Sequence, residues 1–515
     1  MAIAEGVRGL IRRCLPVLVG TLILMAVLTG NGQPSVFHDT QEYYGGANQI
    51  FHNLLHRDEI GITRNSNGDV VSKAYATDPK TIAFTSGRIA SRPIFYGLLL
   101  YPAHKIGTLW LLAAVQAGLA AYLLLTLWRA ALPKAPIHNF YALMALLAVG
   151  TPLAFFAGFA MPDIFALLSA VAAAISLFYW SDLRPWDRVV VWIALTVSVL
   201  FHTSHLMSAP IMLVLGVGLL IIEGVPWATA VRRAAPLAAA VATAVVCILV
   251  HNATWAAERG YKSLRPPFLA ARVLADGPGR TYLRSSCAEG VPWALCRYKD
   301  LPLDDNHPIL FSRDPSEGVA NVADIQTLEA IDHEELRFVL GAVAHHPVAQ
   351  ILASLKNTAL QLSHFEPGGP LTSPYTILNT PSLKRSVLPL LIPNADHCRR
   401  SLDCGSRIRA RYWFLIDEVV VAIAIGVLAW RLTAPDVLAT LLRRRPQLGE
   451  SERRLLAVVT FLVLAVVVNA AVCGALSAPA PRYQSRVVAL VPLAAWLVVA
   501  GLGWRRRRAI EAAAN

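Results

Sequence analysis

Charged side chains are scarce in this sequence. Of its 515 residues, 15% are charged and 55% are hydrophobic. A soluble globular domain carries about 25% charged residues, so this deficit argues against a soluble cytosolic enzyme. The sequence also has no internal repeat of the solenoid type and no low-complexity tract.

Cysteine spacing of the kind that holds a metal is missing. Three of the seven cysteines lie in or beside apolar runs, namely Cys14, Cys247 and Cys473. The other four form two close pairs, Cys287 with Cys296 and Cys398 with Cys404, and neither pair has the CxxC spacing of a zinc site. Close pairs in an oxidising compartment suggest disulfides. We expect two disulfides, with free thiols and a metal site as the alternatives.

Long apolar runs are what the sequence has instead. A helix needs about 20 residues to cross about 30 Å of hydrocarbon; several runs reach this length and a few are shorter. They lie at 15–29, 108–128, 139–159, 163–180, 189–201, 205–222, 236–251, 413–430, 455–474 and 487–502. The sequence therefore predicts an all-α polytopic membrane protein with about ten transmembrane helices.

Basic residues outnumber acidic ones, with 46 Lys and Arg against 33 Asp and Glu and a net charge of +13. If the clusters between the runs all face the cytoplasm, every short loop obeys the positive-inside rule. We therefore expect a multi-pass protein of the inner (plasma) membrane with both termini cytoplasmic. No basic stripe is interleaved with aromatics, so nucleic acid is not an expected partner. The clusters are Arg8, Arg12 and Arg13; Arg129 and Lys134; Arg184 and Arg188; Arg232 and Arg233; Arg443, Arg444 and Arg445; Arg453 and Arg454; and 505–508.

The same rule divides one long apolar segment. Val189–Ile222 would be roughly 51 Å long as a single helix, and the basic clusters on its two sides can both be cytoplasmic only if it crosses twice. The break then falls at "FHTSH" (Phe201–His205), on the outer face. The first run is expected to remain as a span rather than to be cleaved as a signal peptide, because no clear small-x-small site precedes Gln33.

This topology divides the chain into three parts. Residues 1–251 form an N-terminal transmembrane module, whose first outer loop, 30–107, carries polar motifs and a juxtamembrane helix. Residues 252–412 form an extracytoplasmic α-rich subdomain, in which Pro315–Pro347 is expected to form one or two soluble helices. Residues 413–515 hold the C-terminal transmembrane helices.

Three acids are expected on the outer face. Asp39 and Glu42, in "FHDTQEYYGGAN" (Phe37–Asn48), have i, i+3 spacing, so a helix would place both carboxylates on one side. The alternative is a helix capping box with Asp39 as the cap. Asp163, in "MPDIF", opens an apolar run, where an acid usually has a function; the alternative is again a helix cap.

Basic and imidazole side chains gather on the same face. Arginines outside the membrane run against the positive-inside trend, so something there should compensate their charge. A lipid phosphate or diphosphate would do so, since guanidinium binds phosphate oxygens in pairs; the alternative for any one of them is interfacial snorkelling. The residues are Arg88, Arg92, Lys105, His202, His205, Arg482 and Arg486.

Four features together resemble the GT-C superfamily of polyprenyl-phosphate-dependent membrane glycosyltransferases, the group of protein O-mannosyltransferases and lipid A aminoarabinose transferases. They are an acid-plus-Tyr motif after the first run ("HDTQEYY"), an Arg-Pro before an amphipathic stretch ("SRPIFYGLLLYPAHKIG"), an acid opening a later helix ("MPDIF"), and an Arg-Tyr near the last run ("PRYQSRVVALVP"). The likeness covers most of 1–255 and, less distinctly, 455–500. The usual His-Pro-Pro is replaced by Ser-Arg-Pro, and the adjacent Asp-Glu pair of many members is absent.

The resemblance implies a GT-C-like fold and a glycosyltransferase, moving a hexose or pentose from a polyprenyl-phosphate donor to an extracytoplasmic glycan, lipid or protein. It implies Asp39 as general base, with Glu42 and Asp163 as further catalytic acids. A divalent cation such as Mg²⁺ or Mn²⁺ is the possible cofactor, with Asp39 and Asp163 as candidate ligands. The donor phosphate would be bound by Arg88, Arg92, Lys105, His205, Arg482 and Arg486, and the substrates by Tyr43, Tyr44, His202 and Tyr483.

Three other classes remain as alternatives. A polysaccharide polymerase or ligase would use the outer arginines without a base such as Asp39. A lipid-linked glycan transporter would want polar groups at mid-membrane and paired broken helices. A non-catalytic binding protein would explain 252–412 but not the acids and arginines.

Overall fold

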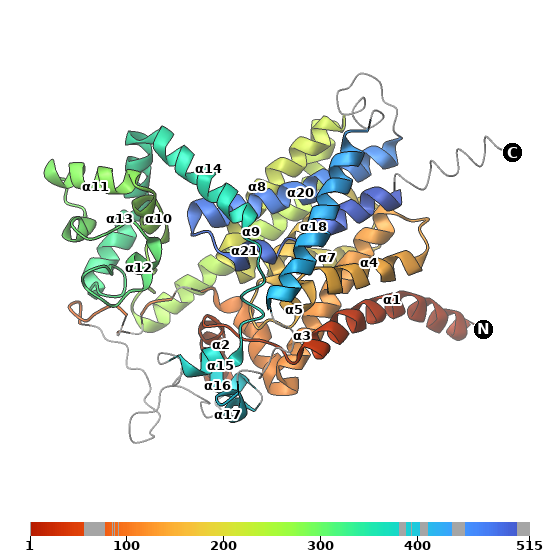
Figure 1. Cartoon of the computed structure of the whole chain (residues 1–515), viewed down its shortest axis with the longest axis horizontal. Helices are drawn as coiled ribbons and strands as arrows, with labels where there is room; N and C mark the ends of the chain where they lie inside the picture. The colour runs from red at the N-terminus through yellow and green to blue at the C-terminus, as the bar shows by residue number, and fades with distance from the viewer. Residues whose placement is uncertain are drawn as a thin grey trace.

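The computed structural model describes residues 2–55, 78–84, 86, 88–90, 92–380, 388–392, 394–401, 410–434 and 449–501. Within these ranges every regular element is a helix, and β-structure is limited to three isolated bridges. The helices pack into a large bundle, with a smaller group of helices, α10 to α13, set to one side (Figure 1). The all-α class predicted from the sequence is confirmed.

All ten apolar runs contain helix. They correspond to α1 (Ala2–Asn31), α3 (Gly97–Ala131), α4 (Ile137–Gly150) with α5 (Leu153–Ala157), α6 (Ile164–Phe178), α7 (Pro185–Phe201), α8 (Thr203–Ile222), α9 (Trp227–Arg259), α18 (Ala410–Leu432), α20 (Glu450–Leu476), and a last helical stretch, Pro481–Gly501, that begins with α21 (Pro481–Ser485). The division of 189–222 into two helices is confirmed, since α7 ends at Phe201 and α8 begins at Thr203.

Seven helices in the described part of the chain are long and apolar enough to cross a membrane, fewer than the ten expected. The other three runs give helices of 14, 15 and 17 residues in α4, α6 and α7. At 1.5 Å per residue, 15 residues reach about 22 Å, which is short of about 30 Å of hydrocarbon. A multi-pass helical membrane protein is therefore supported, with α6 as a short helix whose residues are all buried inside the bundle.

Two large hydrophobic cores divide the molecule, and Phe155, Leu371 and Trp413 form a small third cluster. The larger is built by the long apolar helices. The smaller is built by α10 (Phe268–Asp276), α11 (Pro278–Ala288), α12 (Asn306–Phe311) and α13 (Ile325–His345), together with Ala83 of the first loop. Backbone bridges between Ile82 and Asp324 and between Ile89 and Leu264 attach that loop to the smaller core. The segment predicted as one subdomain contributes to both cores, because α15 (Pro374–Asn379), α16 (Leu388–Leu391) and α17 (Ala395–Cys398) pack on the larger one.

The predicted helices in Pro315–Pro347 are present as α13, and Pro347 opens the next helix, α14 (Pro347–Ser363). A sharp turn at Gly277 joins α10 to α11, with φ of 105°, a conformation that favours glycine. This short connection keeps α10 and α11 close together in the smaller core.

The cysteine predictions have two outcomes. Cys287 and Cys296 form a disulfide, with their Cα atoms 5.8 Å apart, so that prediction is confirmed. Cys398 is also disulfide-bonded, while its expected partner Cys404 lies outside the described residues. The clusters at 443–445 and 505–508 lie outside them as well.

Candidate functional site

The first outer loop and the segment before Asp163 run side by side. The Ser35 amide donates to the Gly158 carbonyl at 2.9 Å, and the Ala160 amide donates to the Ser35 carbonyl at 2.8 Å. The buried Thr40 hydroxyl then donates to the Ala160 carbonyl at 3.1 Å. These bonds fix the start of α2 (Thr40–Leu55) beside the segment that leads into α6, and so bring the two acid motifs together.

The start of α2 also lies against the beginning of α3. A Cβ atom at Gly97 would clash with the Tyr43 carbonyl oxygen, so only glycine permits this approach. Arg92 precedes the short helix η1 (Ile94–Tyr96) that leads into Gly97. Its Nη2 donates to Asp39 Oδ2 at 2.7 Å. The Asp39 side chain remains 19% exposed, which leaves it reachable from outside the protein.

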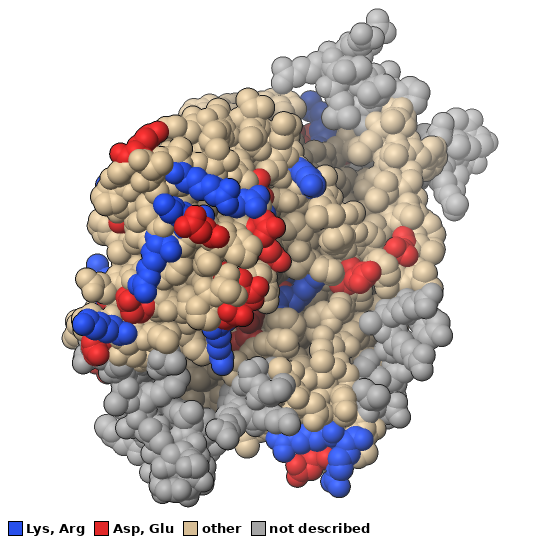
Figure 2. Space-filling model, turned by 60° about the vertical axis from the view of Figure 1, so that its left-hand side comes forward, with Lys and Arg blue, Asp and Glu red and all other residues tan. Residues whose placement is uncertain are grey.

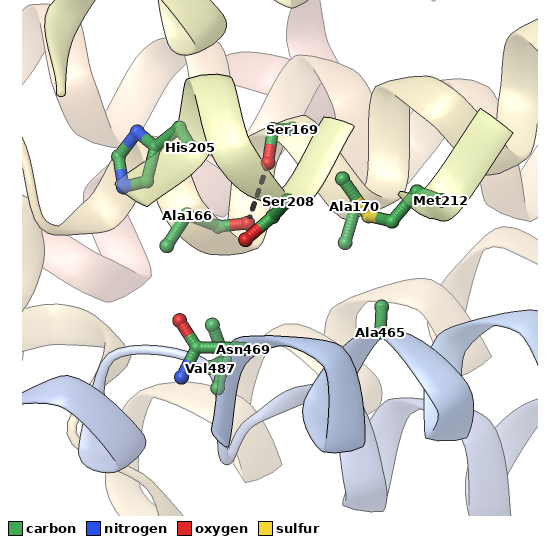
Figure 3. Close-up of a pocket in the computed structure, with 9 residues that line it drawn as sticks. All are labelled: Ala166, Ser169, Ala170, His205, Ser208, Met212, Ala465, Asn469 and Val487. Carbon is green, nitrogen blue, oxygen red and sulfur yellow. Dashed lines mark hydrogen bonds between the residues drawn. The ribbon is translucent and has the colours of Figure 1, made fainter. Parts of the chain in front are cut away.

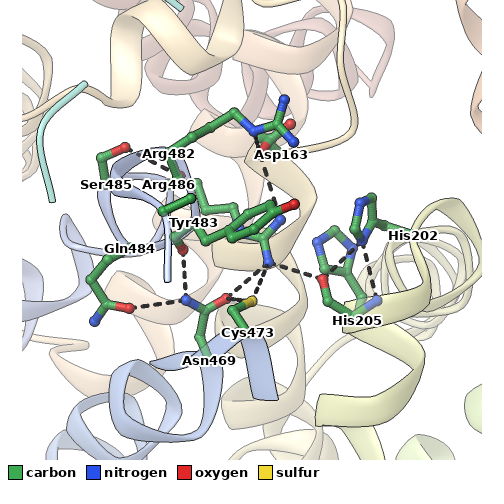
Figure 4. Close-up of polar contacts among 12 residues, drawn as sticks. Asp163, His202, His205, Asn469, Cys473, Arg482, Tyr483, Gln484, Ser485 and Arg486 are labelled. Atoms are coloured by element: carbon green, nitrogen blue, oxygen red, sulfur yellow. Dashed lines mark hydrogen bonds and ion pairs between the residues drawn. The ribbon is translucent and has the colours of Figure 1, made fainter. Parts of the chain in front are cut away.

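Asp163 contacts the same arginine as Asp39 and is more deeply buried. Its side chain is 1% exposed, with Oδ1 lying 3.5 Å from Arg482 Nε and 3.5 Å from Arg486 Nη1 (Figure 4). It occupies the position before α6 but makes no capping hydrogen bond, so the cap alternative does not account for this residue. Arg482 joins the two acids, since its Nη2 lies 3.7 Å from Asp39 Oδ2.

Arg486 is the most deeply placed cation, with a fully buried side chain. Its Nη2 donates to Ser204 Oγ at 2.9 Å, to Asn469 Oδ1 at 3.1 Å and to Cys473 Sγ at 3.2 Å (Figure 4). Asn469 also donates to the Tyr483 carbonyl at 2.6 Å. Helices α8 and α20 thus hold this guanidinium in one position. These partners were not predicted from the sequence, although an asparagine inside the apolar run 455–474 is a signal for such a role.

The arginine cluster, defined here as Arg92, Arg482 and Arg486, contacts two carboxylates, Asp39 and Asp163, and the charge of Glu42 also acts on Arg92. Several buried guanidinium nitrogens nevertheless lack a hydrogen-bond partner among the described residues. They are Arg92 Nε, Arg482 Nη1, and Arg486 Nε and Nη1. An anion with several oxygen atoms is the type of ligand that would accept hydrogen bonds from these donors.

Aromatic rings enclose the arginine cluster. The Phe37 ring lies 4.3 Å from the Arg482 guanidinium carbon, and the Tyr483 ring lies 5.2 Å from Arg482 and 5.1 Å from Arg486. Such contacts favour a cation over the ring face. They also restrict the directions from which a ligand can reach the guanidinium groups.

His38 is an exposed neighbour that the sequence analysis did not select, although it belongs to the same motif. Its ring stacks on Phe37 at 4.7 Å. Desolvation lowers the pKa of His38, with Asp39 opposing the shift and Arg482 adding to it. The imidazole is therefore mainly neutral at neutral pH.

The two tyrosines of the motif differ in their partners. Tyr43 is buried with its ring against Tyr96, and its hydroxyl has no hydrogen-bond partner among the described residues. Burial raises the pKa of Tyr43. The Tyr44 hydroxyl lies 3.1 Å from His104 Nδ1, on the side of α2 that faces α3. Tyr43 therefore borders the acid and arginine groups, whereas Tyr44 is part of the α2–α3 contact.

His202 and His205 lie deeper, beside Arg486. His205 Nδ1 lies 2.8 Å from the Ser198 carbonyl and must donate to it, so its Nε2 is left as an acceptor. A cavity of about 10 Å³ lies next to this ring, lined also by Ser169, Ser208 and Asn469 (Figure 3). It is large enough for about one water molecule. His202 caps α8, accepting from the Ser204 amide at 3.1 Å.

Three predicted site residues lie outside the arginine cluster. Arg88 pairs with Glu329 of α13 at 2.6 Å, and its guanidinium lies over the Tyr261 ring. It therefore joins the first loop to the smaller core and is not part of the arginine cluster. Lys105 is exposed near the Tyr101 ring. Glu42 lies in the first turn of α2, close enough for its charge to act on Arg92.

A metal does not fit the acids as they are arranged. Asp39 and Asp163 share Arg482, so a guanidinium lies where a bridging cation would need to be. No group of three or more His, Cys, Asp or Glu side chains with metal-binding geometry occurs in the described ranges. We therefore derive no chemical step through a metal.

The turn that carries Arg482 is held from outside by α14. Gln361 Nε2 donates to the Ala480 carbonyl at 2.9 Å, and its Oε1 accepts from the Ala480 amide at 2.9 Å. Arg272 of α10 donates to the Ser477 carbonyl at 3.3 Å and to Asp276 at 2.6 Å. The outer helices therefore set the position of the residues that lead into Arg482.

Comparisons with protein-family models, curated proteins and solved structures found no match. The function is therefore argued from the chemistry of the site.

Proposed function

We propose that this protein is a membrane glycosyltransferase of the GT-C type, which moves a sugar from a polyprenyl-phosphate donor to an extracytoplasmic acceptor. The observation that carries the proposal is the arginine cluster, with buried guanidinium nitrogens that lack a hydrogen-bond partner among the described residues, next to one buried and one reachable carboxylate. Such a site combines an anion-binding half with an acid–base half. A donor phosphate and an acceptor hydroxyl would need these two halves.

The arginine cluster supplies the phosphate-binding half. Arg482 and Arg92 lie near the exposed side and Arg486 beneath them, so a phosphate at this place meets donors from several directions. Guanidinium groups bind phosphate oxygens in pairs. In a buried site they also stabilise the negative charge that develops on a leaving phosphate. Asp163 keeps Arg482 and Arg486 together when no anion is bound, since buried like charges would otherwise repel each other.

Asp39 supplies the acid–base half. In the ion pair with Arg92 and Arg482, the Asp39 carboxylate is engaged by guanidinium groups. A donor phosphate that draws these guanidinium groups to itself would free Asp39 to accept a proton. Asp39 then takes the proton of the acceptor hydroxyl while the hydroxyl oxygen attacks the anomeric carbon. The bond from that carbon to the phosphate oxygen breaks, and its electron pair leaves with the polyprenyl phosphate.

The proposed site faces the periplasm or outside, in an inner (plasma) membrane protein with cytoplasmic termini. This orientation rests on the basic clusters between the apolar runs and on the positive-inside rule. The smaller core, including its disulfide Cys287–Cys296, would then lie on the oxidising side of the membrane.

A polysaccharide polymerase or ligase is the second candidate. Arg486 favours it to some extent, because this cation is held by neutral partners and Asp163 without any contribution from Asp39. An enzyme that relied on arginines alone would not require a base at position 39. The two candidates therefore differ in how much activity depends on that carboxylate.

The test is a transfer assay with purified protein in lipid nanodiscs. Radiolabelled polyprenyl-phosphate sugars are supplied with a cell-envelope extract as the source of acceptors. Transfer of label to any extract component, with release of polyprenyl phosphate, supports the proposal. Binding of the donor without transfer from any sugar tested would contradict a transferase and favour a transport or binding role.

A further inference from the structure

Helix α14 has its polar and apolar sides reversed relative to a water-soluble helix. Its three amide side chains point toward protein. Gln350 and Asn357 donate to the Asp276 carboxylate at 2.8 Å each, and Gln361 bonds both ways to the Ala480 backbone. Gln361 and Gln350 are buried. The side of α14 that contacts α10 and the α20–α21 connection is therefore its polar side.

The opposite side of α14 is apolar and uncovered. Val348, Ile351, Leu352 and Leu355 are each between 58% and 68% exposed. Their spacing of three, four and seven residues places them on one face of the helix. We call these four residues the outer face of α14. The exposed Leu362 continues the same spacing by one further heptad.

This arrangement is not the one expected for a helix on a water-exposed surface. A surface helix in water buries its apolar stripe and exposes its polar one, and α14 does the reverse: Gln350, Asn357 and Gln361 bond to protein while the apolar stripe is exposed. The helix also carries a single charged residue, Lys356, which lies beside the outer face. A lysine at that place can extend its ammonium group past an apolar surface to water or headgroups. In hydrocarbon the same pattern is the favourable one.

The neighbouring element is a membrane helix. The closest approach of α14 is to α20, one of the helices able to cross the bilayer: a Cβ atom at Gly474 would lie 2.6 Å from the Asn357 carbonyl oxygen. α13 lies at 105° to α14, and the two helices meet the length and hydropathy criterion for a membrane span only when they are taken together. On the face shown in Figure 2, the smaller core that includes α13 carries many charges of both signs, as expected of a surface in water. α14 is thus attached to a spanning helix and differs from the charged helices that precede it.

We infer that the outer face of α14 lies in the hydrocarbon of the lipid bilayer. The occupant of the face is lipid acyl chain, supplied by the same bilayer that surrounds α20. α14 is then a lipid-contacting support: one side rests in the membrane, while the other, through Gln361, holds the turn that precedes Arg482. This inference needs only the membrane location of the protein and does not depend on the reaction that it catalyses.

The experiment places a fluorescent label on the outer face of the full-length protein. Leu352→Cys is labelled with a bimane probe in a background in which Cys14 and Cys247 are changed to serine, and the protein is assembled in phosphatidylcholine nanodiscs. Asp304→Cys, in the exposed loop before α12, is the control. We expect phosphatidylcholine brominated on its acyl chains to quench the label at 352 at least twofold more than at 304. Aqueous iodide should show the reverse order.

Two results would overturn the inference. One is a label at 352 that iodide quenches as strongly as at 304 and that brominated lipid leaves unchanged. The other is a photoreactive group at 352 that crosslinks to a second copy of the chain or another protein instead of lipid. If Leu352→Cys does not fold, Leu355→Cys on the same face replaces it with the same expected results.

Discussion

The arginines of the smaller core and those of the arginine cluster are compensated in different ways. In and around the smaller core, three arginines each have a carboxylate of their own: Arg88 pairs with Glu329, Arg272 with Asp276, and Arg297 with Asp324. In the cluster, the ion pairs are shared: Arg482 contacts both Asp39 and Asp163, and Asp163 contacts both Arg482 and Arg486. One-to-one pairs hold elements together. The shared set is the place where we propose that a ligand anion binds.

The same comparison separates two arginines that look alike in the sequence. Arg88 and Arg92 are four residues apart, and both were predicted to bind the donor phosphate. Arg88 forms an ion pair with Glu329, which lies 241 residues further along the chain, whereas Arg92 forms an ion pair with Asp39. Substituting one arginine from a one-to-one ion pair and one from the arginine cluster tests this difference.

Asp39→Asn is expected to have the largest effect on activity. Asparagine keeps the size of the side chain but cannot accept the proton, and loss of a general base usually lowers the rate about 10²–10⁴-fold. Donor binding should persist. The measurement is the rate of sugar transfer by purified protein.

Asp305→Asn is the matched control, because Asp305 caps α12 by accepting from the His307 amide and lies outside the site. Asparagine caps a helix about as well as aspartate, so this variant should transfer at the normal rate. If Asp39→Asn also keeps near-normal activity, Asp39 is a structural residue and the base lies elsewhere.

Asp163→Asn should have the largest effect on stability. It leaves the buried Arg482 and Arg486 without their shared carboxylate, and removing one partner of a buried ion pair costs about 3–5 kcal/mol. The measurement is the thermal unfolding midpoint in detergent. Asp417→Asn is the control, because Asp417 is as buried but has no ion pair among the described residues. Equal losses in both variants would mean that the arginines do not depend on Asp163.

Gln361→Ala should have a smaller effect, confined to the donor. It removes two hydrogen bonds from Ala480, each worth about 1 kcal/mol, and loosens the turn before Arg482. We expect about a tenfold rise in KM for the donor with kcat changed much less. Ser363→Ala, which removes an exposed hydroxyl that, among the described residues, bonds only to the Leu360 carbonyl of the same helix, should leave KM unchanged. A fall in kcat alone, or the same change in both variants, would show that Gln361 does not position the turn.

The positions of most long helices can be predicted from the sequence, because a long apolar run rarely forms anything other than a helix. The number of membrane-spanning helices cannot be predicted in the same way, because the length of an apolar run does not determine the length of the helix that it forms. The run 139–159 is divided at Thr151 and Pro152 into α4 and α5. α6 is short because it begins only after the segment that packs beside Ser35.

The site was accessible to sequence reasoning only in part. Asp39, Asp163, Arg482 and Arg486 stand out because charged residues at the ends of apolar runs are unusual. Their mutual contacts depend on backbone bonds between Ser35 and Ala160 that leave no trace in residue type. The lipid-type face of α14 was missed for another reason. The polar residues of its inner side lower the average hydropathy, so only the exposed fraction of each side chain reveals the reversal.

The central claim is that the arginine cluster binds the phosphate of a polyprenyl donor. The most direct measurement is the affinity of purified protein for polyprenyl phosphate in nanodiscs, compared among the wild type, Arg482→Ala and Arg88→Ala. Hydrogen bonds to charged groups contribute about 1.5–3 kcal/mol, so Arg482→Ala should weaken binding by roughly 10–100-fold. Arg88→Ala should bind normally and instead lower the stability of the smaller core. Equal affinity in all three proteins, or a loss only in Arg88→Ala, would contradict the account.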